Sequence, residues 1–129
     1  MKVVFSCFGH KNILGTHKTT LEFTEEGNLT AQGNCIVGVR SKFPDLSAFR
    51  SSGTVRLILK VDNLKDMLVA VPNKSFVQGR ELVVRMGAFP SERTFAVNSS
   101  KAAMHISREI ILKMKNPAQE MLIVVTDEA

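Results

Sequence analysis

Thr54-Val-Arg-Leu-Ile-Leu-Lys-Val-Asp62 is the stretch of sequence that most clearly decides the fold. Its odd-numbered positions 55 to 61 are all Val or Leu, and they alternate with Arg56, Ile58, Lys60 and Asp62. Side chains of a strand point alternately to its two faces, so this period predicts a strand with one face in a core. The chain is therefore expected to be dominated by strands.

The same alternation recurs on both sides of this stretch. We expect further strands at residues 3–8, 20–24, 35–39, 67–71, 82–86, 94–97 and 120–126. Two short helices fit between them. One is expected at residues 48–51 with Ser47 as its N-cap, and the other at 107–115, beginning at Ser107. His105, two residues before that cap, is assigned a structural role.

Both halves of the chain, at about residues 1–63 and 64–129, follow the order β-β-β-α-β. Residues 39–42 resemble 97–101, residues 45–47 resemble 105–107, and residues 57–62 resemble 122–127. One half of about 60 residues is too small to bury a core comfortably. We therefore predict one domain, residues 1–129, of the α+β class and β-dominated. Its tandem repeats would share a barrel-like or sandwich core across a pseudo-two-fold axis.

The composition favours an anionic partner only weakly. Lys and Arg total 17 against 12 Asp and Glu, giving a net charge of +5. The basic residues are scattered, however, so a mixed solvated surface is the simpler interpretation. Trp and Tyr are absent, and the eight Phe are assigned mainly to the core, leaving no obvious platform for stacking bases.

The two cysteines do not suggest a secreted disulfide framework. No apolar span approaches the roughly 18 residues of a membrane helix, and the N-terminal apolar run is too short for a signal peptide. We expect a cytoplasmic protein without membrane contact. The oligomeric state is left open.

A polar loop precedes the strand at residues 20–24. Between residues 9 and 19 it contains two of the three histidines, two lysines, two glycines and an asparagine. Loops that lead into strands often carry binding residues on a rigid scaffold. The matching stretch of the second half, residues 74–80, keeps basic residues at both ends but has no histidine, which favours a function specific to the first half.

An anion-binding site suits these residues best. Gly9 and Gly15 would let backbone N–H groups approach a ligand, and lysines and threonines would supply charge and donors. The predicted binding residues are His10, Asn12, His17, Lys18 and Thr19, flanked by Lys42 and Lys101. We expect a phosphate-bearing metabolite or RNA. No nucleotide can be singled out, because no nucleotide fingerprint is present. Solvated lysines are the competing interpretation.

Catalysis is the main alternative. His10 or His17 could act as an acid or base in a small hydrolase or transferase. The competing interpretation is that loop histidines donate to backbone carbonyls. A nucleophile scheme pairing Cys7 or a threonine with His10 lacks an orienting acid, because Glu22 looks exposed. Whether the protein is an enzyme stays open.

A zinc site would use Cys7, His10, His17 and Cys35. Their spacing is unlike that of known zinc fingers, and each cysteine shares a strand face with apolar residues. Cys7 lies on the face of Val3 and Phe5, so inert buried thiols are the better interpretation. We expect no metal and no cofactor.

The motif Gly9-His-x-Asn-Ile13, followed by Thr16–Thr24, Leu29-Thr30 and Gly33-x-Cys-Ile-Val-Gly-Val39, resembles an archaeal family of uncharacterised proteins, a domain of unknown function. Residues 93–97 and 100–103 are similar to its second half. Where the family pattern has another Gly-His-Pro, this chain has Val71-Pro-Asn73, which argues against two symmetric sites. The resemblance implies an archaeal, cytosolic protein and supplies no activity and no catalytic residue.

Overall fold

The computed structural model describes residues 1–128, and strands dominate it. The strands are β1 (Lys2–Phe8), β2 (Thr20–Thr24), β3 (Ile36–Gly38), β4 (Val55–Val61), β5 (Leu64–Pro72), β6 (Glu81–Arg85), β7 (Thr94–Val97) and β8 (Glu120–Thr126). The predicted β-dominated fold is confirmed, and most strand bounds agree to within a residue. β5 begins three residues before the predicted start, because a tight turn at Asp62, whose φ is 54°, joins it directly to β4.

The helical elements are short. The predicted helix at 48–51 is a 3-10 helix, η1 (Ser47–Ser51), preceded by Leu46 at the N-cap position, so the prediction of Ser47 as its cap is wrong. Asp45 instead accepts hydrogen bonds from the Ser47 N–H and hydroxyl, at 2.9 and 2.6 Å. The second prediction is confirmed in shorter form. Ser107 caps α1 (Arg108–Lys113), and a 3-10 turn, η2 (Ala103–His105), lies just before it.

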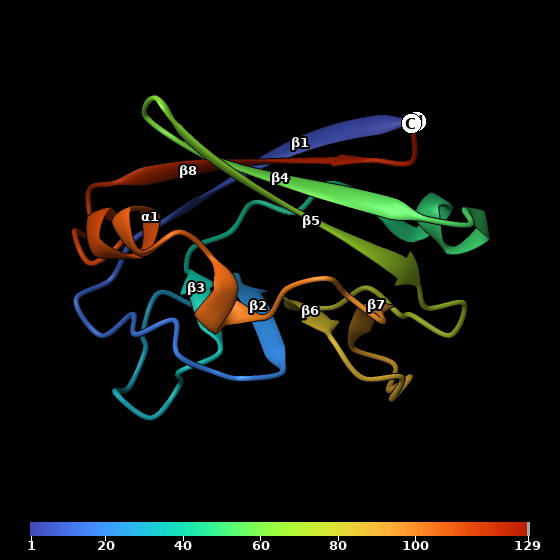
Figure 1. The fold of residues 1–129 in the computed structure, drawn as a ribbon, viewed down its shortest axis with the longest axis horizontal. Helices are drawn as coiled ribbons and strands as arrows, with labels where there is room; N and C mark the ends of the chain where they lie inside the picture. Colours follow the sequence, from blue (N-terminus) through green and yellow to red (C-terminus); the bar gives the residue numbers. More distant parts are fainter. Residues whose placement is uncertain (129) are drawn as a thin grey trace.

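All eight strands form one mixed sheet in the order β1-β8-β4-β5-β7-β6-β2-β3. The sheet bends into two layers, with β1, β8, β4 and β5 above β3, β2, β6 and β7 in Figure 1. The upper four strands are all antiparallel. The β2–β3 and β6–β7 pairs are parallel.

Of the two predicted core types, barrel-like or sandwich, the barrel-like one is wrong, because the sheet does not close. Phe8 of β1 and Val39, just after β3, form one antiparallel bridge with two 2.8 Å hydrogen bonds. Within residues 1–128 no longer ladder joins these two edge strands. The chain turns away at the next residue, Arg40, which has a φ of 50°, so a single residue pair forms. The internal repeat and its axis stay a prediction.

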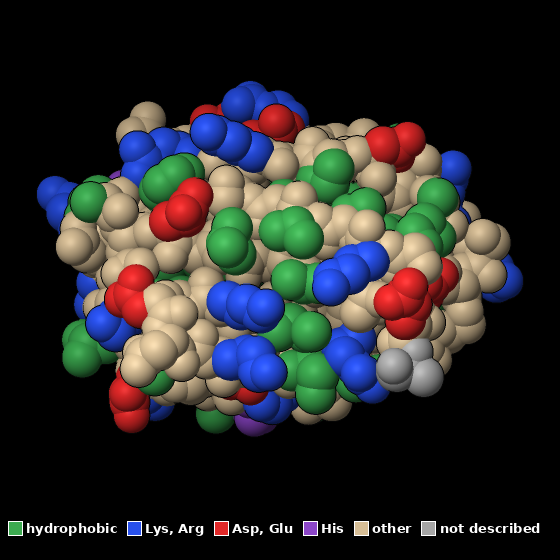
Figure 2. All heavy atoms as spheres, turned by 90° about the horizontal axis from the view of Figure 1, so that it is seen from above, with side chains coloured by type: hydrophobic (Ala, Val, Ile, Leu, Met, Phe, Trp, Pro, Cys, Tyr) green, Lys and Arg blue, Asp and Glu red, His purple; other side chains and the backbone are tan. Residues whose placement is uncertain are grey.

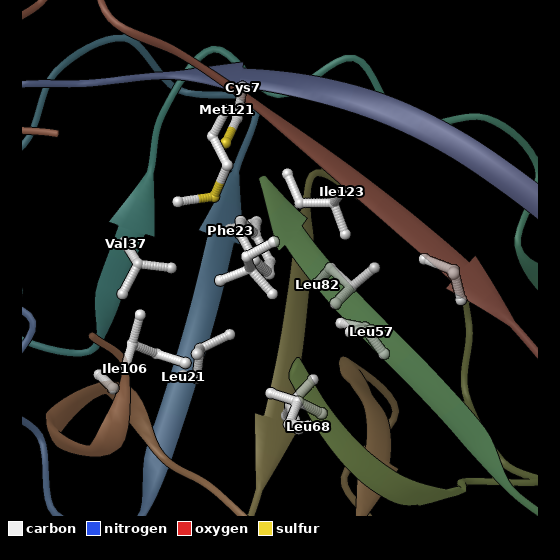
Figure 3. Close-up of a cluster of buried hydrophobic side chains, with 14 of the residues drawn as sticks. Cys7, Leu21, Phe23, Val37, Leu57, Leu68, Leu82, Ile106, Met121 and Ile123 are labelled. Atoms are coloured by element: carbon white, nitrogen blue, oxygen red, sulfur yellow. The ribbon is translucent and has the colours of Figure 1, made fainter. Parts of the chain in front are cut away.

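The core lies between the two layers and is filled by alternate residues of the strands (Figure 3). Phe5 and Phe23 meet edge to face with ring centroids 5.7 Å apart, and Phe95 makes similar contacts with Phe49 and Phe76. Cys7 is fully buried here, and burial raises the pKa of its thiol well above the usual value. This agrees with the prediction that Cys7 lies on an inward strand face.

Candidate functional site

The loop that follows β1 is held tightly against the C-terminal end of α1. Gly9 donates its N–H to the Gln119 carbonyl at 2.9 Å, and His10 donates to the Met114 carbonyl at 2.8 Å. A Cβ added at Gly9 would lie 2.1 Å from the Asn116 carbonyl oxygen. Gly9 is therefore needed for close backbone contact, and its amide is already engaged within the protein.

Two basic side chains bind the carbonyls of the same loop. Lys115 Nζ donates to the Ile13 carbonyl at 2.7 Å, and Arg108 donates to the Gly15 carbonyl at 2.9 Å. Gly15 has a φ of +58°, and an added Cβ would lie 2.8 Å from Ile111. The loop thus directs these carbonyls toward cations of the protein itself.

His10 and His17 both use Nδ1 to accept backbone hydrogen bonds. The Asn12 N–H donates to His10 at 3.0 Å. The N–H groups of Thr19 and Thr20 donate to His17 at 3.1 and 3.0 Å. A ring nitrogen that accepts a hydrogen bond carries no proton, so Nδ1 of each ring is the acceptor and Nε2 is left for other contacts. The interpretation that loop histidines bond to the backbone gave the right kind of partner. The direction of the hydrogen bonds is reversed, because these histidines accept from N–H groups and do not donate to carbonyls.

The seven predicted binding residues do not surround one hollow. Asn12 donates its side-chain amide to the Leu29 carbonyl at 2.7 Å, while Lys18 and Thr19 are exposed. Lys42 bonds through its backbone N–H to Ser6 on the outer edge of β1. Lys101 lies at the β5 side of the same layer, with β8 and β4 between them. Their common role as ligand contacts stays a prediction.

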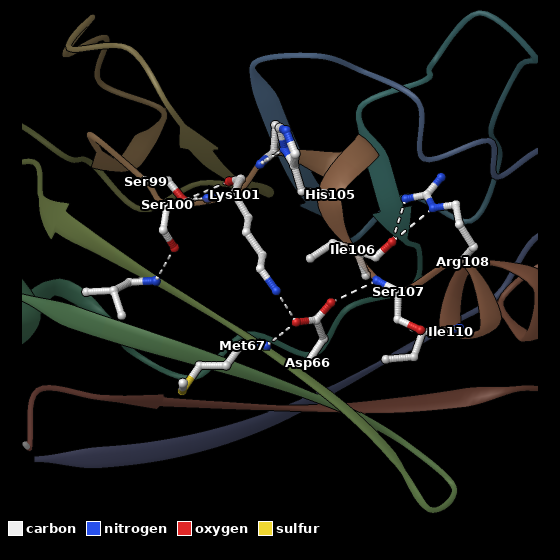
Figure 4. A network of polar contacts seen from close by, with 12 residues as sticks. Asp66, Met67, Ser99, Ser100, Lys101, His105, Ile106, Ser107, Arg108 and Ile110 are labelled. Carbon is white, nitrogen blue, oxygen red and sulfur yellow. Dashed lines mark hydrogen bonds and ion pairs between the residues drawn. The ribbon is translucent and has the colours of Figure 1, made fainter.

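Lys101 is already neutralised by an acidic side chain. Its ammonium forms an ion pair with Asp66, which also accepts the N–H groups of Ser107 at 2.8 Å and Met67 at 2.7 Å (Figure 4). Burial alone would raise the pKa of Asp66, but these hydrogen bonds outweigh it and hold the pKa below its usual value. Asp66 therefore links β5, the 99–101 turn and the start of α1.

The zinc set is not assembled. Among residues 1–128 no three His, Cys, Asp or Glu side chains are grouped so that they could hold a metal ion. Cys7 is in the core, whereas Cys35 is half-buried and donates its thiol to Glu22 Oε1 at 3.9 Å.

Glu22 is the residue whose environment the sequence did not reveal. It was expected to be exposed, but it is only 5% exposed. Burial, followed by the hydrogen bond and charge of Glu81, raises the pKa of Glu22 to about 8. The Glu81 pKa is lowered, first by its hydrogen bond with Glu22. The alternating pattern Leu21-Glu22-Phe23 suggested an exposed carboxylate, yet all five β2 residues are buried.

Other polar side chains complete the surroundings of Glu22. Arg85 Nε donates to the Thr94 hydroxyl at 3.0 Å, and Arg93 pairs with Glu81 at 2.9 Å. The two carboxyls share a proton over the neutral pH range, while the arginines balance the remaining charge. This cluster can respond to pH, and its groups are bonded mainly to one another.

The outer face of the upper layer, formed by β1, β8, β4 and β5, is different, because its side chains point away from the core. Most of them are at least partly exposed, although Val124 and Thr126 are only 6% and 7% exposed. Strand register places its outward residues in three rows that cross all four strands. The first row is Lys2, Thr126, Arg56 and Val69, the second is Val4, Val124, Ile58 and Met67, and the third is Ser6, Leu122, Lys60 and Lys65. An apolar row thus lies between two rows that carry the cations, and we call this surface the outer face.

The cations of the outer face lack acidic partners. Lys60 and Lys65 are directly opposite one another on β4 and β5. Within the described part of the chain, neither they nor Lys2 and Arg56 form an ion pair. The Arg56 Nε atom is buried and has no hydrogen-bond partner there. Figure 2 shows the mixture of hydrophobic and basic side chains across this face, with most acidic ones toward its rim.

Two shallow hollows open on the outer face. One of about 300 Å³ is lined by Ile58, Lys65, Asp66, Met67 and Lys101. Another of about 280 Å³ is lined by Thr54, Val55, Arg56, Val69, Thr126, Asp127 and Glu128. Each hollow is lined by basic, acidic and apolar side chains, so this face is not flat.

The family model described as Domain of unknown function (DUF371) matches residues 5–128. The chain belongs to this family. It is also similar to the uncharacterized protein MJ0206 of the archaeon Methanocaldococcus jannaschii, with 32% identity over 124 residues that cover 89% of this chain and 92% of the relative. The resemblance to an archaeal family of unknown function is thus confirmed, and membership of DUF371 brings no activity with it.

No helix in the described residues is long and apolar enough to cross a membrane.

Proposed function

We propose that this DUF371 protein is a binding module for an anionic partner, which it engages on the outer face. The observation that carries the proposal is the directly opposed pair Lys60 and Lys65. Like charges facing each other across two strands destabilise a sheet, and no carboxylate among the described residues forms an ion pair with either lysine. A bound anion would remove that cost.

The second cationic row strengthens the proposal. Lys2 and Arg56 lie two rows from Lys60 and Lys65, four residues along the strands, which is about 14 Å at 3.4 Å per residue. A partner with two anionic groups at that separation would contact both rows. The phosphate-bearing metabolite or RNA expected from the sequence, and a carboxylate-rich chain, share this chemistry.

The loop of residues 9–20 is the competing location for the same function. Its exposed cations, Lys11 and Lys18, remain available to a ligand, whereas its histidines and Asn12 are bonded within the protein. The acid–base alternative at His10 or His17 also stays a prediction, with the Nε2 atoms as the groups that would act.

We also propose that the two halves are structural repeats, which bears on the role of His10. The Ser75 N–H donates to Asn73 Oδ1 at 3.0 Å, as the Asn12 N–H does to His10 Nδ1. Arg40 and Asn98 both have positive φ, 50° and 53°. Asn73 in the second half therefore accepts the same kind of turn hydrogen bond as His10. This favours a role of His10 in turn formation over a role in catalysis.

Binding of three anionic probes, measured by fluorescence anisotropy or competition at 50 and 200 mM salt, tests the proposal. The probes are a labelled 12-nucleotide oligouridylate, inorganic tripolyphosphate and polyglutamate, which separate phosphate from carboxylate partners. For the nucleotide, the log of the affinity should fall with the log of salt by about 0.7 for each phosphate neutralised.

The double variant Lys60→Ala/Lys65→Ala should lower the affinity for the probe at least tenfold. The matched control Lys11→Ala/Lys18→Ala removes the same charge from the predicted loop and should leave affinity within twofold. Loss of binding in the control alone would move the site to the loop. Absence of binding by all three probes would overturn the proposed function.

A further inference from the structure

The middle row of the outer face is apolar and is open to solvent at its two ends, whereas Val124 within it is only 6% exposed. Val4 is 51% and Met67 42% exposed at its two ends, and Ile58 lies between them. Leu122, 42% exposed, adjoins this row from the next one. Exposed apolar side chains gathered on one sheet face, with cations on both sides, mark an interaction surface.

We propose that the outer face binds an acidic amphipathic helix of another protein, laid across the four strands along the row from Val4 to Met67. This rests on the proposed function and names its partner class. The apolar stripe of the helix covers the row, and acidic residues on both flanks of that stripe pair with the cations on either side.

The dimensions of the row suit a helix. Four strands about 4.8 Å apart make the row about 14 Å long, which is the rise of roughly ten helical residues or three turns. A neighbouring row lies two residues away along the strands, about 7 Å. That distance is close to the 5–6 Å radius of a helix with its side chains, so residues on each flank reach the cationic rows.

The charges select an acidic helix. Lys60 and Lys65 lie on one side of the row, and Lys2 and Arg56 on the other. A basic or neutral helix would bury the opposed Lys60 and Lys65 without neutralising them, whereas glutamates on both flanks of the stripe would pair with all four cations.

Two other occupants fit less well. A second copy of this chain would bring its own basic rows against these, placing like charges together. RNA is read on open sheets through aromatic side chains that stack with bases, and none of the twelve residues in the three rows is aromatic. The apolar row is therefore better matched by aliphatic side chains of a helix.

The test uses the full chain and a labelled 18-residue helical peptide with leucines at positions i, i+3, i+4 and i+7 flanked by glutamates. A scrambled peptide of the same composition serves as its control. By anisotropy at 50 mM salt, the helical peptide should bind at least tenfold more tightly than the scrambled one. Val4→Ser/Met67→Ser and Lys60→Ala/Lys65→Ala should each weaken it at least tenfold, while Val77→Ser, a 57% exposed apolar residue elsewhere, should not.

The outcomes separate this inference from the proposed function. Suppose that Lys60→Ala/Lys65→Ala lowers the affinity for polyglutamate and for both peptides equally, while Val4→Ser/Met67→Ser changes no affinity. Anion binding then holds, and the proposal of a helical partner is overturned. Tighter binding of oligouridylate than of the helical peptide also overturns it. So does a dimer, seen by analytical ultracentrifugation, that Val4→Ser/Met67→Ser dissociates. If no anionic probe binds, both proposals fail. Thermal melting checks that each variant is folded.

Discussion

Replacing Glu22 by Gln should flatten the dependence of stability on pH. Glu22 is 5% exposed and lies beside Glu81, with which it shares a hydrogen bond, and its pKa is raised from 4.5 to about 8. The folded state therefore keeps a proton on Glu22 at pH values where the unfolded chain has lost it. Gln is neutral at every pH and, like the protonated acid, can donate to Glu81.

The sign follows from the direction of the shift. A carboxyl with a raised pKa stabilises the fold fully below about pH 4.5, and this stability is lost as the pH rises through about 8. At 1.36 kcal/mol per pKa unit, the loss between pH 5 and 9 would be about 4 kcal/mol. Relaxation around the ionised carboxylate reduces such costs, so we expect about 2 to 4 kcal/mol. The lowered pKa of Glu81 acts below pH 4.5, outside this interval.

Urea unfolding at pH 5, 7 and 9 measures the effect. The free energy of unfolding of the natural chain should fall by about 2 to 4 kcal/mol more across this range than that of Glu22→Gln. The smaller fall that remains in the variant comes from groups such as Cys35, whose pKa is also raised. The variant should therefore be the more stable protein at pH 9. Glu25→Gln, at an exposed position, is the control and should follow the natural chain. Parallel pH curves for Glu22→Gln and the natural chain would refute the reasoning.

Three further predictions concern the loop and the thiols. Gly9→Ala should destabilise the fold by about 3 kcal/mol or more, because its Cβ would lie 2.1 Å from the Asn116 carbonyl oxygen; a melting temperature within 2 °C of the natural chain would contradict this. His10→Asn should cost less than about 0.5 kcal/mol, since Asn73 makes the same turn bond, whereas His10→Ala should cost about 1 kcal/mol in denaturant titrations. Burial raises the thiol pKa of both cysteines, so iodoacetamide at pH 7.5 should leave Cys7 unmodified and label Cys35 at least tenfold more slowly than in urea, as followed by mass spectrometry.

The strands were predictable because each has a buried face with a period of two. The alternation from Val55 to Val61 appears directly as buried and less buried positions of β4. Closure of the sheet was not predictable in the same way. It depends on where the chain leaves β3, and the positive φ of Arg40, a residue without turn preference, ends the pairing after one bridge.

The candidate site was harder to predict, because it depends on register and on distant chain segments. Burial of Glu22 requires Cys35 and Glu81, which no local pattern places beside it. One residue correspondence of the predicted repeat also does not match the burial seen in the sheet. The sequence paired Leu57 with Leu122, yet Leu57 is buried and Leu122 is 42% exposed, so that correspondence is one residue out of phase with the sheet.

The register of one hairpin places two lysines directly opposite one another on the outer face. Asp62 and Asn63 form a two-residue turn, and this length places Lys60 opposite Lys65 and Ile58 opposite Met67 on the same face. In the sequence these lysines are five residues apart and belong to an unremarkable scatter of basic residues. A turn longer by one residue would shift β5 against β4 and separate the lysines, so the same composition would present no opposed pair. The outer face is therefore a property of the fold, and the anion binding that we propose for it depends on the β4–β5 turn as much as on the lysines themselves.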